Sequence, residues 1–552
     1  MGCTPAPMGA WYFGWLGMIP LWLVVLGADL PELLKFLPGR KTAGSNSMGF
    51  SLPELLDKYP IKKNVFYGCL WGLGYHGLAI AWITGIHPLT WMGVPWLSSL
   101  AIAAVCWLLL SLTGALFLGL WVLLMQGIEK FFFHDFSNLS SAKLLRKVLI
   151  GTALWCLLEG LFSMGDLWWT SLSYTQSPVN LAILQLGKIS GPNTITAAIV
   201  SINGLLAASW LSWANPDKSS DTSLNKTQGK KFLAGGISLL AVLHIIGGVI
   251  YLQPIADSPE QAMNIGIIQG NIPNPIKLYP EGWRKAIEGY TSGYEQLADQ
   301  GVAAVLTPET ALPFLWSDQV RERSSFYRAI LAKGVMAWVG GFGQAGNRLT
   351  NSLFTITGQG EIFSQYNKVK LVPLGEYIPF EQFIGQFINR LSPLEAKLQA
   401  GAGTQIFNTP LGRAIVGICY ESAFSQHFQR QAAAGGEFII TASNNSHYGL
   451  SMPAQHHAQD VLRAVEVDRW AVRATNTGYS GIVDPHGNTL WISEINTYAT
   501  HAHTVYRRQT QTWYTRWGDW LTPLLLLLGL MAAIAPKFST SAAPLPKAKS
   551  LR

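Results

Sequence analysis

Long apolar runs constrain this chain more than any other feature of its sequence. A helix needs about 20 mainly apolar residues to cross the hydrocarbon core of a bilayer. Seven segments predict such helices, at residues 9–28, 64–87, 97–126, 148–165, 194–213, 232–252 and 519–536. The composition agrees, because 49% of the 552 residues are hydrophobic and only 13% are charged. That balance is too apolar for an ordinary soluble protein, so we predict an integral membrane protein.

Lysine and arginine residues concentrate in alternate loops between these segments. The loops after the first, third and fifth segments are basic, whereas the loop after the second has no Lys or Arg and that after the fourth has only Lys188. Because short basic loops stay in the cytoplasm, we predict that the amino terminus and residues 253–518 lie outside it. These loops account for much of the net charge of +8, and no basic-aromatic motif indicates a nucleic-acid partner.

The sequence changes character at residue 253, where short apolar runs begin to alternate with Gly, Asn and Pro turns. This texture is typical of a layered α/β domain. It predicts strands within 263–272, 301–309, 335–342, 352–372, 413–421 and 437–444, helices at 283–300, 319–333 and 455–473, and hairpin turns at 358–361 and 484–488. We predict four parts: a helix bundle at 1–252, a catalytic domain at 253–515, a final membrane helix at 516–537 and a cytoplasmic basic tail at 538–552.

The cysteines point to one candidate nucleophile. The five are Cys3, Cys69, Cys106, Cys156 and Cys419, without the paired spacing of disulfides or of a zinc site. Three lie in apolar runs, where a cysteine usually packs as a small hydrophobe. Cys419 instead ends the apolar run AIVGI and precedes Tyr420 and Glu421, so a strand delivers it to a loop at a sheet edge. Inert packing is the alternative reading of this residue.

Two further polar residues occupy comparable places. Glu309, in LTPETALP, follows an apolar strand, and beside a thiol it would act as a general base. Lys368, in YNKVKLVPLGEYIPF, lies in a predicted strand whose alternation places Lys370 on the same face. Each residue alone is more simply explained as a solvated side chain. Together, a thiol, a base and a fixed cation are what acyl transfer through a tetrahedral intermediate requires.

The motifs around these residues resemble the Glu-Lys-Cys triad of the nitrilase superfamily. They read P-E-T at Glu309, Y-x-K-x-x-L-V-P-x-G-E at Lys368 and G-I-C-Y-E at Cys419. With apolar segments on both sides, the whole chain resembles the apolipoprotein N-acyltransferase family. Supporting segments are IIQGNIP at 267–273, SNNSHYG at 443–449, RATNTGYSG at 473–481 and YTRWGDW at 514–520.

This resemblance implies a fold and a set of site residues. The fold is a multi-pass α-helical membrane bundle with an extracytoplasmic α/β domain of the nitrilase type, an αββα sandwich. Cys419 becomes the nucleophile, Glu309 the base and Lys368 the oxyanion stabiliser. Further expected positions around the site are Glu376, Tyr420, Glu421, Asn444 and Arg473.

Some of these positions also have structural explanations. Asn444 could bond loop backbone, and Arg473 could pair with Glu466. Glu466 itself lies three residues after Arg463, which predicts an ordinary surface pair on a helix. Within the predicted spans, His76, Glu159 and His244 line a lipid path or, more simply, form hydrogen bonds between helices.

The implied reaction moves a fatty acyl chain from a membrane phospholipid, through a cysteine thioester, to the N-terminal amine of diacylglyceryl-cysteine in an apolipoprotein. The implied partners are the phospholipid donor, the diacylglyceryl-modified apolipoprotein and the lipid bilayer, with no cofactor and no metal. The implied location is the bacterial inner membrane, with the catalytic domain on the periplasmic side. Two alternatives stay open: a membrane-anchored carbon-nitrogen hydrolase (amidase) using the same triad, and an inactive membrane scaffold.

Three departures from the family pattern limit what the resemblance implies. Lys277-Leu278-Tyr279 stands where the family often has a tryptophan, and SNNSHYG replaces the usual S-N-D-x-W-F-G. Substrate contacts around Leu278 and His447 therefore do not follow from it. Family members usually have eight membrane spans, against the seven predicted for this chain.

Overall fold

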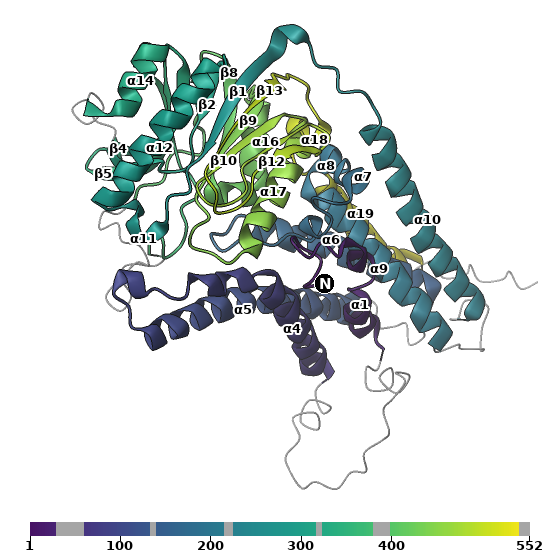
Figure 1. The fold of residues 1–552 in the computed structure, drawn as a ribbon. Helices are drawn as coiled ribbons and strands as arrows, with labels where there is room; N and C mark the ends of the chain where they lie inside the picture. Colours follow the sequence, from purple (N-terminus) through teal and green to yellow (C-terminus); the bar gives the residue numbers. More distant parts are fainter. Residues whose placement is uncertain (29–59, 133–139, 215–224, 316–322, 379–397, 540–552) are drawn as a thin grey trace, which may run out of the picture.

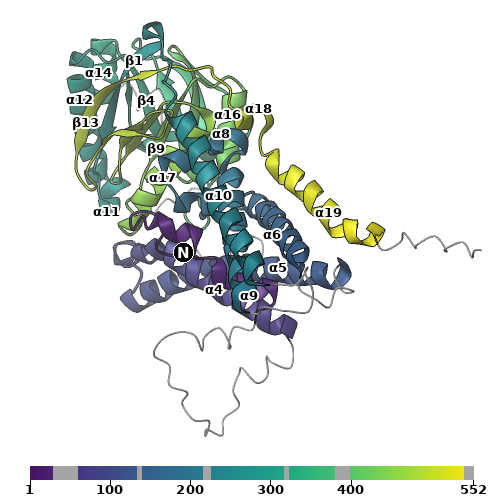
Figure 2. The same ribbon diagram turned by 90° about the vertical axis from the view of Figure 1, so that its right-hand side faces the viewer.

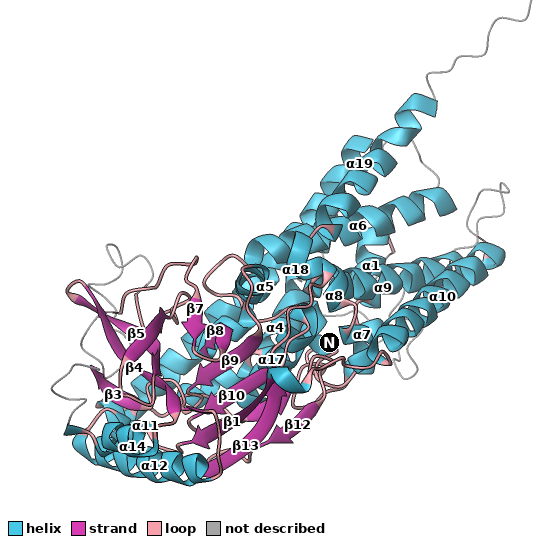
Figure 3. Cartoon of the chain, turned by 90° about the horizontal axis from the view of Figure 1, so that it is seen from above, coloured by secondary structure: helices cyan, strands magenta, loops and turns pink. Residues whose placement is uncertain are grey.

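The computed structural model describes residues 1–28, 60–132, 140–214, 225–315, 323–378 and 398–539. Helices fill one end of the molecule and strands gather at the other, as the view in Figure 3 shows. The helical end is made of the amino-terminal part of the chain together with the last helix. The two ends pack directly against each other (Figure 1).

Each predicted apolar segment coincides with helical structure. The helical elements before residue 253 are η1 (Trp11–Trp15), α1 (Ile19–Leu26), α4 (Pro60–Ala79), η3 (Ala81–Ile86), η4 (Thr90–Met92), α5 (Trp96–Phe132), α6 (Ser141–Phe162), η5 (Leu172–Thr175), α7 (Leu181–Leu184), α8 (Gly187–Ser190), α9 (Pro192–Ala214) and α10 (Lys226–Tyr251). At the other end of the chain are α18 (Trp513–Trp517) and α19 (Leu521–Ser539). Figure 2 shows α10 and α19 as long helices that leave the strand-rich end. Among the described residues, α5, α9 and α10 are long and apolar enough to cross a membrane by length and composition.

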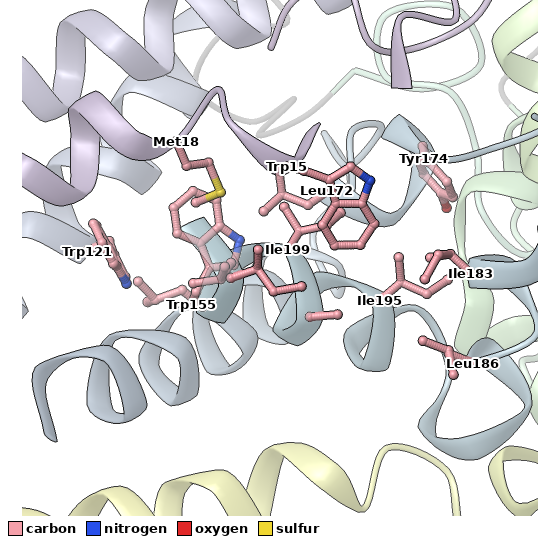
Figure 4. Packing of buried hydrophobic residues seen from close by; sticks show 14 of the residues in the cluster. Trp15, Met18, Trp121, Trp155, Leu172, Tyr174, Ile183, Leu186, Ile195 and Ile199 are labelled. Atoms are coloured by element: carbon pink, nitrogen blue, oxygen red, sulfur yellow. The ribbon is translucent and has the colours of Figure 1, made fainter. Parts of the chain in front are cut away.

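Interlocking tryptophans form the centre of the helical end (Figure 4). The ring of Trp121 meets the rings of Trp22 and Trp155 edge to face, at centroid distances of 5.1 and 5.3 Å. The indole N–H of Trp22 donates to the Val200 carbonyl at 3.0 Å, and that of Trp121 donates to the Gly151 carbonyl at 2.9 Å. Because the buried indole N–H groups of Trp22 and Trp121 each find a carbonyl, these two large side chains pack without an unsatisfied donor.

Two β-sheets make up the other end. The first sheet has the strand order β13-β1-β2-β4-β5-β6, with β3 paired to β4. Its strands are β1 (Ala262–Gln269), β2 (Ala304–Leu306), β3 (Leu312–Leu315), β4 (Met336–Ala345), β5 (Arg348–Ile356), β6 (Ile362–Asn367) and β13 (Ala499–Tyr506). The second sheet has the order β12-β11-β10-β9-β8-β7. Its strands are β7 (Phe407–Thr409), β8 (Gly412–Ile418), β9 (Phe438–Ser443), β10 (Ala471–Thr475), β11 (Gly481–Val483) and β12 (Thr489–Ile492).

The sheets stack face to face between two layers of helices. The helical elements of this domain are η6 (Pro259–Gln261), α11 (Asn274–Lys277), α12 (Pro280–Asp299), α14 (Ser325–Lys333), η7 (Cys419–Ala423), α16 (Ser425–Ala433) and α17 (Ser451–Val467). Strand alternation explains the layers: Ile267 packs between the sheets, whereas Ile268 packs with α12 and α14 on the outer face. In the second sheet Ile440 packs between the sheets, and Ile439 packs with α16 and α17. The predicted αββα sandwich is therefore present.

The outer helices of the second sheet share one apolar core with the helical end. Phe428 of α16 and Leu462 of α17 belong to the same buried cluster as Ile183 and Trp155. The catalytic domain is thus packed onto the helices through a continuous hydrophobic contact, which fixes their relative position.

A buried ion pair lies at this junction and corrects one expectation. The guanidinium of Arg463 donates to Glu466 Oε1 at 2.9 Å, and both side chains are fully buried rather than on the surface. Arg463 also donates to the Ser422 carbonyl at 3.2 Å and to the Tyr174 hydroxyl at 3.3 Å. The pair is buried because the face of α17 that carries it packs against η5 and α16.

Two other predictions were wrong in detail. The helix predicted at 455–473 ends at Val467, because Asp468 adopts a left-handed conformation with φ of 55°. Arg473 therefore lies in β10. Strand β6 ends at Asn367, so alternation does not extend to Lys368 and Lys370. The predicted helix at 319–333 is seen as α14, and its residues 319–322 lie outside the described part of the chain.

The buried Arg463–Glu466 pair generates a stability prediction. Replacing Glu466 by Gln leaves a fully buried guanidinium without its carboxylate, which lowers the free energy of unfolding by about 3 kcal/mol or more. Thermal unfolding in detergent should show a clearly lower midpoint. The control is Glu288→Gln in α12, which removes a solvent-exposed partner of Arg284 and should leave the midpoint unchanged. Equal midpoints for the two variants would contradict this account.

Candidate active site

Cys419 begins the turn η7 directly after strand β8. Its φ is 53°, a left-handed conformation that is rare for a residue with a side chain. Its sulfur faces the Asn444 carbonyl at 3.9 Å, and its own carbonyl oxygen accepts from His456 Nε2 at 2.7 Å. The turn holds the thiol at the end of a core strand, where backbone strain is typical of a functional site.

Lys368 lies between two carboxylates next to this turn. Its ammonium nitrogen is 2.9 Å from Glu309 Oε1 and 3.0 Å from Glu376 Oε2. Asn351 Nδ2 donates to both carboxylates, at 2.7 Å to Glu309 and 2.9 Å to Glu376. The lysine side chain is only 1% exposed. An amide and an ammonium therefore hold the two acidic groups in fixed positions.

The electrostatics of the site follow from burial and from these close charges. Burial, with a smaller contribution from the Glu309 carboxylate and against the opposing effect of Lys368, raises the pKa of the Cys419 thiol to about 12. Burial also raises the pKa of Glu309, but Lys368, Lys277 and Asn351 together outweigh burial and bring the net pKa below its usual value. Burial lowers the pKa of Lys368, but Glu309 and Glu376 reverse this and raise it well above its usual value. The resting site therefore holds a neutral Cys419 thiol beside the Glu309 carboxylate and the Lys368 ammonium.

Glu421 joins the parts of the chain that carry the lysine and the thiol. Its buried carboxylate accepts backbone N–H bonds from Ile418 at 2.7 Å and from Val369 at 2.6 Å. These donors flank Cys419 and Lys368 respectively. Glu421 therefore fixes the spacing between the two residues through the backbone beside them.

A cavity of about 620 Å³ lies over the site. Glu309, Lys368, Glu376, Cys419 and Asn444 all line it. Residues of the helical end also line it, and most of them are apolar, among them Ile80, Trp82, Ile83, Ile86, Leu89, Leu109 and Leu110. Polar residues of the α/β domain and mainly apolar residues of the helical end thus line one space.

Tyr420 connects the α/β domain to the helical end. Its hydroxyl donates to the carbonyl oxygens of Asp166 or Trp168, each at 2.7 Å, and its ring stacks on Trp169 at 6.2 Å. Asn444 offers its backbone carbonyl to the Cys419 thiol, and its side-chain oxygen accepts from Asn476 at 3.1 Å. Both residues therefore lie at the cavity, as the sequence predicts.

Arg473 and Lys370 lie elsewhere. Arg473 forms a buried ion pair with Asp460, not with Glu466, and it does not line the cavity. The Lys370 ammonium donates to the Met164 carbonyl at 3.1 Å, so it points away from Lys368 toward the helical end. The two lysine side chains point in different directions because strand β6 ends at Asn367, so strand alternation no longer places them on the same face.

The polar residues of the predicted spans have assigned contacts. His76 lines the cavity and hydrogen-bonds the Thr170 hydroxyl at 2.7 Å. Glu159 accepts from the Trp155 indole at 3.0 Å, and it lines a second cavity of about 290 Å³. His244 contacts Asn180 at 3.2 Å. His76 and Glu159 thus line cavities, and each of the three residues also makes a hydrogen bond.

Sequence reasoning missed three residues that surround the triad. Asn351 orients two carboxylates, His456 bonds the Cys419 carbonyl, and Lys277 donates to the Glu309 carbonyl at 3.0 Å. Asn351 lies one residue before a predicted strand, with no motif around it, and His456 lies inside a predicted helix without a signal of its own. Lys277 was recorded as part of a departure from the family pattern. Among the described residues, no group of three His, Cys, Asp or Glu side chains could hold a metal.

Comparison with known proteins identifies the class of protein to which this domain belongs. Residues 265–504 match the carbon-nitrogen hydrolase family model, in agreement with the αββα layers, and the domain is of that class. Residues 50–205 match the model of the apolipoprotein N-acyltransferase N-terminal domain.

Relatives extend the similarity over nearly the whole chain. The apolipoprotein N-acyltransferase of a Nostoc species is 52% identical over 96% of both chains. That of a Synechocystis species is 46% identical, over 96% of this chain and 98% of its own. A solved amidase from a Nesterenkonia species, 17% identical, covers 47% of this chain and 95% of its own with a TM-score of 0.35. The chain belongs to the apolipoprotein N-acyltransferase family and is an acyltransferase, and its apolar helices are those of a membrane protein.

Glu421 generates a prediction about positioning. In Glu421→Gln an amide replaces a carboxylate that accepts backbone N–H bonds on both sides of the site, so each charge-assisted bond is lost or weakened. We expect kcat for acyl transfer to fall about 10- to 100-fold while the protein still folds. The control is Glu437→Gln, whose carboxylate accepts from Gln509 away from the cavity. An unchanged kcat in Glu421→Gln would contradict the positioning role.

Proposed function

We propose that this enzyme transfers a fatty acyl chain from a membrane phospholipid to the N-terminal amine of a diacylglyceryl-modified apolipoprotein, through a thioester on Cys419. One observation carries the proposal: Glu309, Lys368 and Cys419 come from three separate segments and line one cavity, and the residues of the helical end that also line it are mainly apolar. Such a cavity can hold an ester with its chains on the helical side and its carbonyl at the thiol.

In the first half-reaction Glu309 removes the proton of the Cys419 thiol while the sulfur attacks the ester carbonyl. The negative charge of Glu309 then disappears, so it no longer opposes charge at the sulfur. The carbon–oxygen ester bond breaks, and the proton on Glu309 passes to the departing glycerol oxygen. The products are a thioester on Cys419 and a lysophospholipid.

In the second half-reaction the α-amino group of the apolipoprotein attacks the thioester carbonyl. Glu309 accepts a proton from the nitrogen, the carbon–sulfur bond breaks, and the same proton returns to the sulfur. The products are an N-acylated apolipoprotein and the free thiol. No group other than the two lipid substrates and the three side chains is consumed or needed.

Lys368 stabilises the oxyanion of both tetrahedral intermediates. Its ammonium has three N–H donors, and the two carboxylates account for two of them. The third donor is left for the substrate oxygen. Glu376 has a separate task, because it keeps a negative charge beside Lys368 when Glu309 is protonated, and so keeps the lysine charged throughout the cycle.

The membrane arrangement belongs to the same proposal. Seven apolar segments cross the bacterial inner membrane as a multi-pass bundle at 1–252 with a final helix at 516–537. The catalytic domain at 253–515 lies on the periplasmic side, and the tail at 538–552 is cytoplasmic. The support is the alternation of basic and non-basic loops along the sequence.

Substitutions of the triad test the proposal. With phospholipid and a diacylglyceryl peptide as substrates, we expect Cys419→Ala to abolish N-acylation, and Glu309→Gln and Lys368→Met each to lower it about 100-fold or more. Glu376→Gln should lower the rate of N-acylation less than these substitutions do, because Lys368 keeps Glu309 as its ion-pair partner for most of the cycle. The control is Cys3→Ala, which removes an exposed thiol and should leave the rate unchanged.

The same assay separates acyl transfer from hydrolysis. Release of free fatty acid in place of N-acyl peptide would identify an amidase-type hydrolase and refute the proposed function. Full activity of Cys419→Ala would refute the thioester.

A further inference from the structure

Lys277 places a second ammonium group in the active-site cavity. It ends the short helix α11 and lines the cavity together with the triad. Figure 1 shows α11 on the side of the catalytic domain that faces α5. Its side chain is buried, and its ammonium donates to the backbone carbonyl of Glu309 at 3.0 Å. Within the described ranges, no carboxylate forms an ion pair with it.

The surroundings of Lys277 differ from those of Lys368, which lines the same cavity. Lys368 has two carboxylates within 3.0 Å, which match its charge as the chain folds. Among the described residues Lys277 has only a neutral carbonyl as its hydrogen-bond acceptor, so two of its three N–H donors find no acceptor there. A buried ammonium with unpaired N–H donors lowers the stability of the folded protein unless an anion binds to it.

The charge on Lys277 is present under working conditions. Burial lowers the pKa of Lys277 to about 8, while Glu309 and Cys419 act in the opposite direction. The group is therefore mainly protonated at neutral pH, and its charge is felt at both the base and the nucleophile.

The residues around Lys277 define what kind of anion fits. Asn274, which shares α11 with Lys277, accepts from Asn444 at 3.3 Å, and Ser446 donates to Asn444 at 2.7 Å, so three polar side chains lie together at the cavity. Leu109 and Leu110 of α5 line the same cavity. A phospholipid carries its phosphodiester only a few bonds from its ester groups, with the acyl chains on the other side. Such a molecule can present an ester to Cys419 and an anion to these polar groups at the same time.

We propose that Lys277 binds the phosphodiester of the donor phospholipid while the donor ester lies at Cys419. This inference rests on the proposed function and names the group that recognises its first substrate. Lys277 is a binding residue in this account, and it selects acyl donors that carry an anionic phosphate. The acceptor enters after the lysophospholipid has left, so its attack on the thioester does not need this contact.

Two acyl donors distinguish binding of the phosphate from support of the Glu309 loop. The wild-type protein and Lys277→Met are acylated with a diacyl phospholipid or with p-nitrophenyl palmitate, which has no phosphate. Acylation of the Cys419 peptide is followed by mass spectrometry. We expect kcat/KM of Lys277→Met to fall about 10- to 100-fold with the phospholipid, the effect of losing a charge-assisted contact. With p-nitrophenyl palmitate we expect a change of less than about threefold.

Lys370→Met is the matched control, because its ammonium bonds the Met164 carbonyl and does not line the cavity. It should change both rates by less than about threefold. An equal loss with both donors in Lys277→Met would show that Lys277 only supports Glu309 and would overturn the inference, as would no loss with either. A wild-type protein that accepts neither donor would instead refute the proposed function.

Discussion

The ion cluster of Lys368 with Glu309 and Glu376 is the interaction on which the site depends. A buried ammonium survives only with close compensation, and the two carboxylates supply it at 2.9 and 3.0 Å. In the proposed mechanism the second carboxylate matters because the first changes its charge during the reaction. When Glu309 takes the thiol proton there, Glu376 remains as an ion-pair partner of Lys368. Under this proposal the cluster tolerates a proton moving through it, which a single ion pair would not.

The cluster is useful only because the helical and catalytic parts share one core. Two sets of contacts hold the helical end in place beside the thiol. They are the buried contacts of α16 and α17 with the amino-terminal helices and the hydrogen bonds of Tyr420 to the chain at 166–168. The cavity at the thiol is lined by the triad and by mainly apolar residues of the helical end. A soluble enzyme with the same sheets would have water in place of those helical residues. The helices thus add a place for acyl chains beside a site built for acyl chemistry.

Much of this was predictable from sequence because the signals are local. Apolar runs marked every long helix of the helical end, and the strand before Cys419 is visible as five apolar residues before a polar turn. The motif context of Glu309 and Lys368 predicted residues that line one cavity. Contacts between distant segments were not predictable. The burial of Arg463 and Glu466 depends on η5 and α16, and the roles of Asn351, His456 and Lys277 depend on elements that meet only in the folded chain. The end of α17 was missed because the apolar pattern continues past Asp468, where a left-handed residue stops the helix.

The central claim is that the thiol of Cys419 carries the acyl chain between the two lipids. Intact mass spectrometry of the purified protein, after exposure to phospholipid without any acceptor, tests it most directly. The account predicts one added fatty acyl unit, located on the peptide that contains Cys419, removed by hydroxylamine and absent from Cys419→Ala. An unmodified Cys419 in a preparation that still N-acylates its acceptor, or an acyl unit on another residue that is passed to the acceptor, would contradict it.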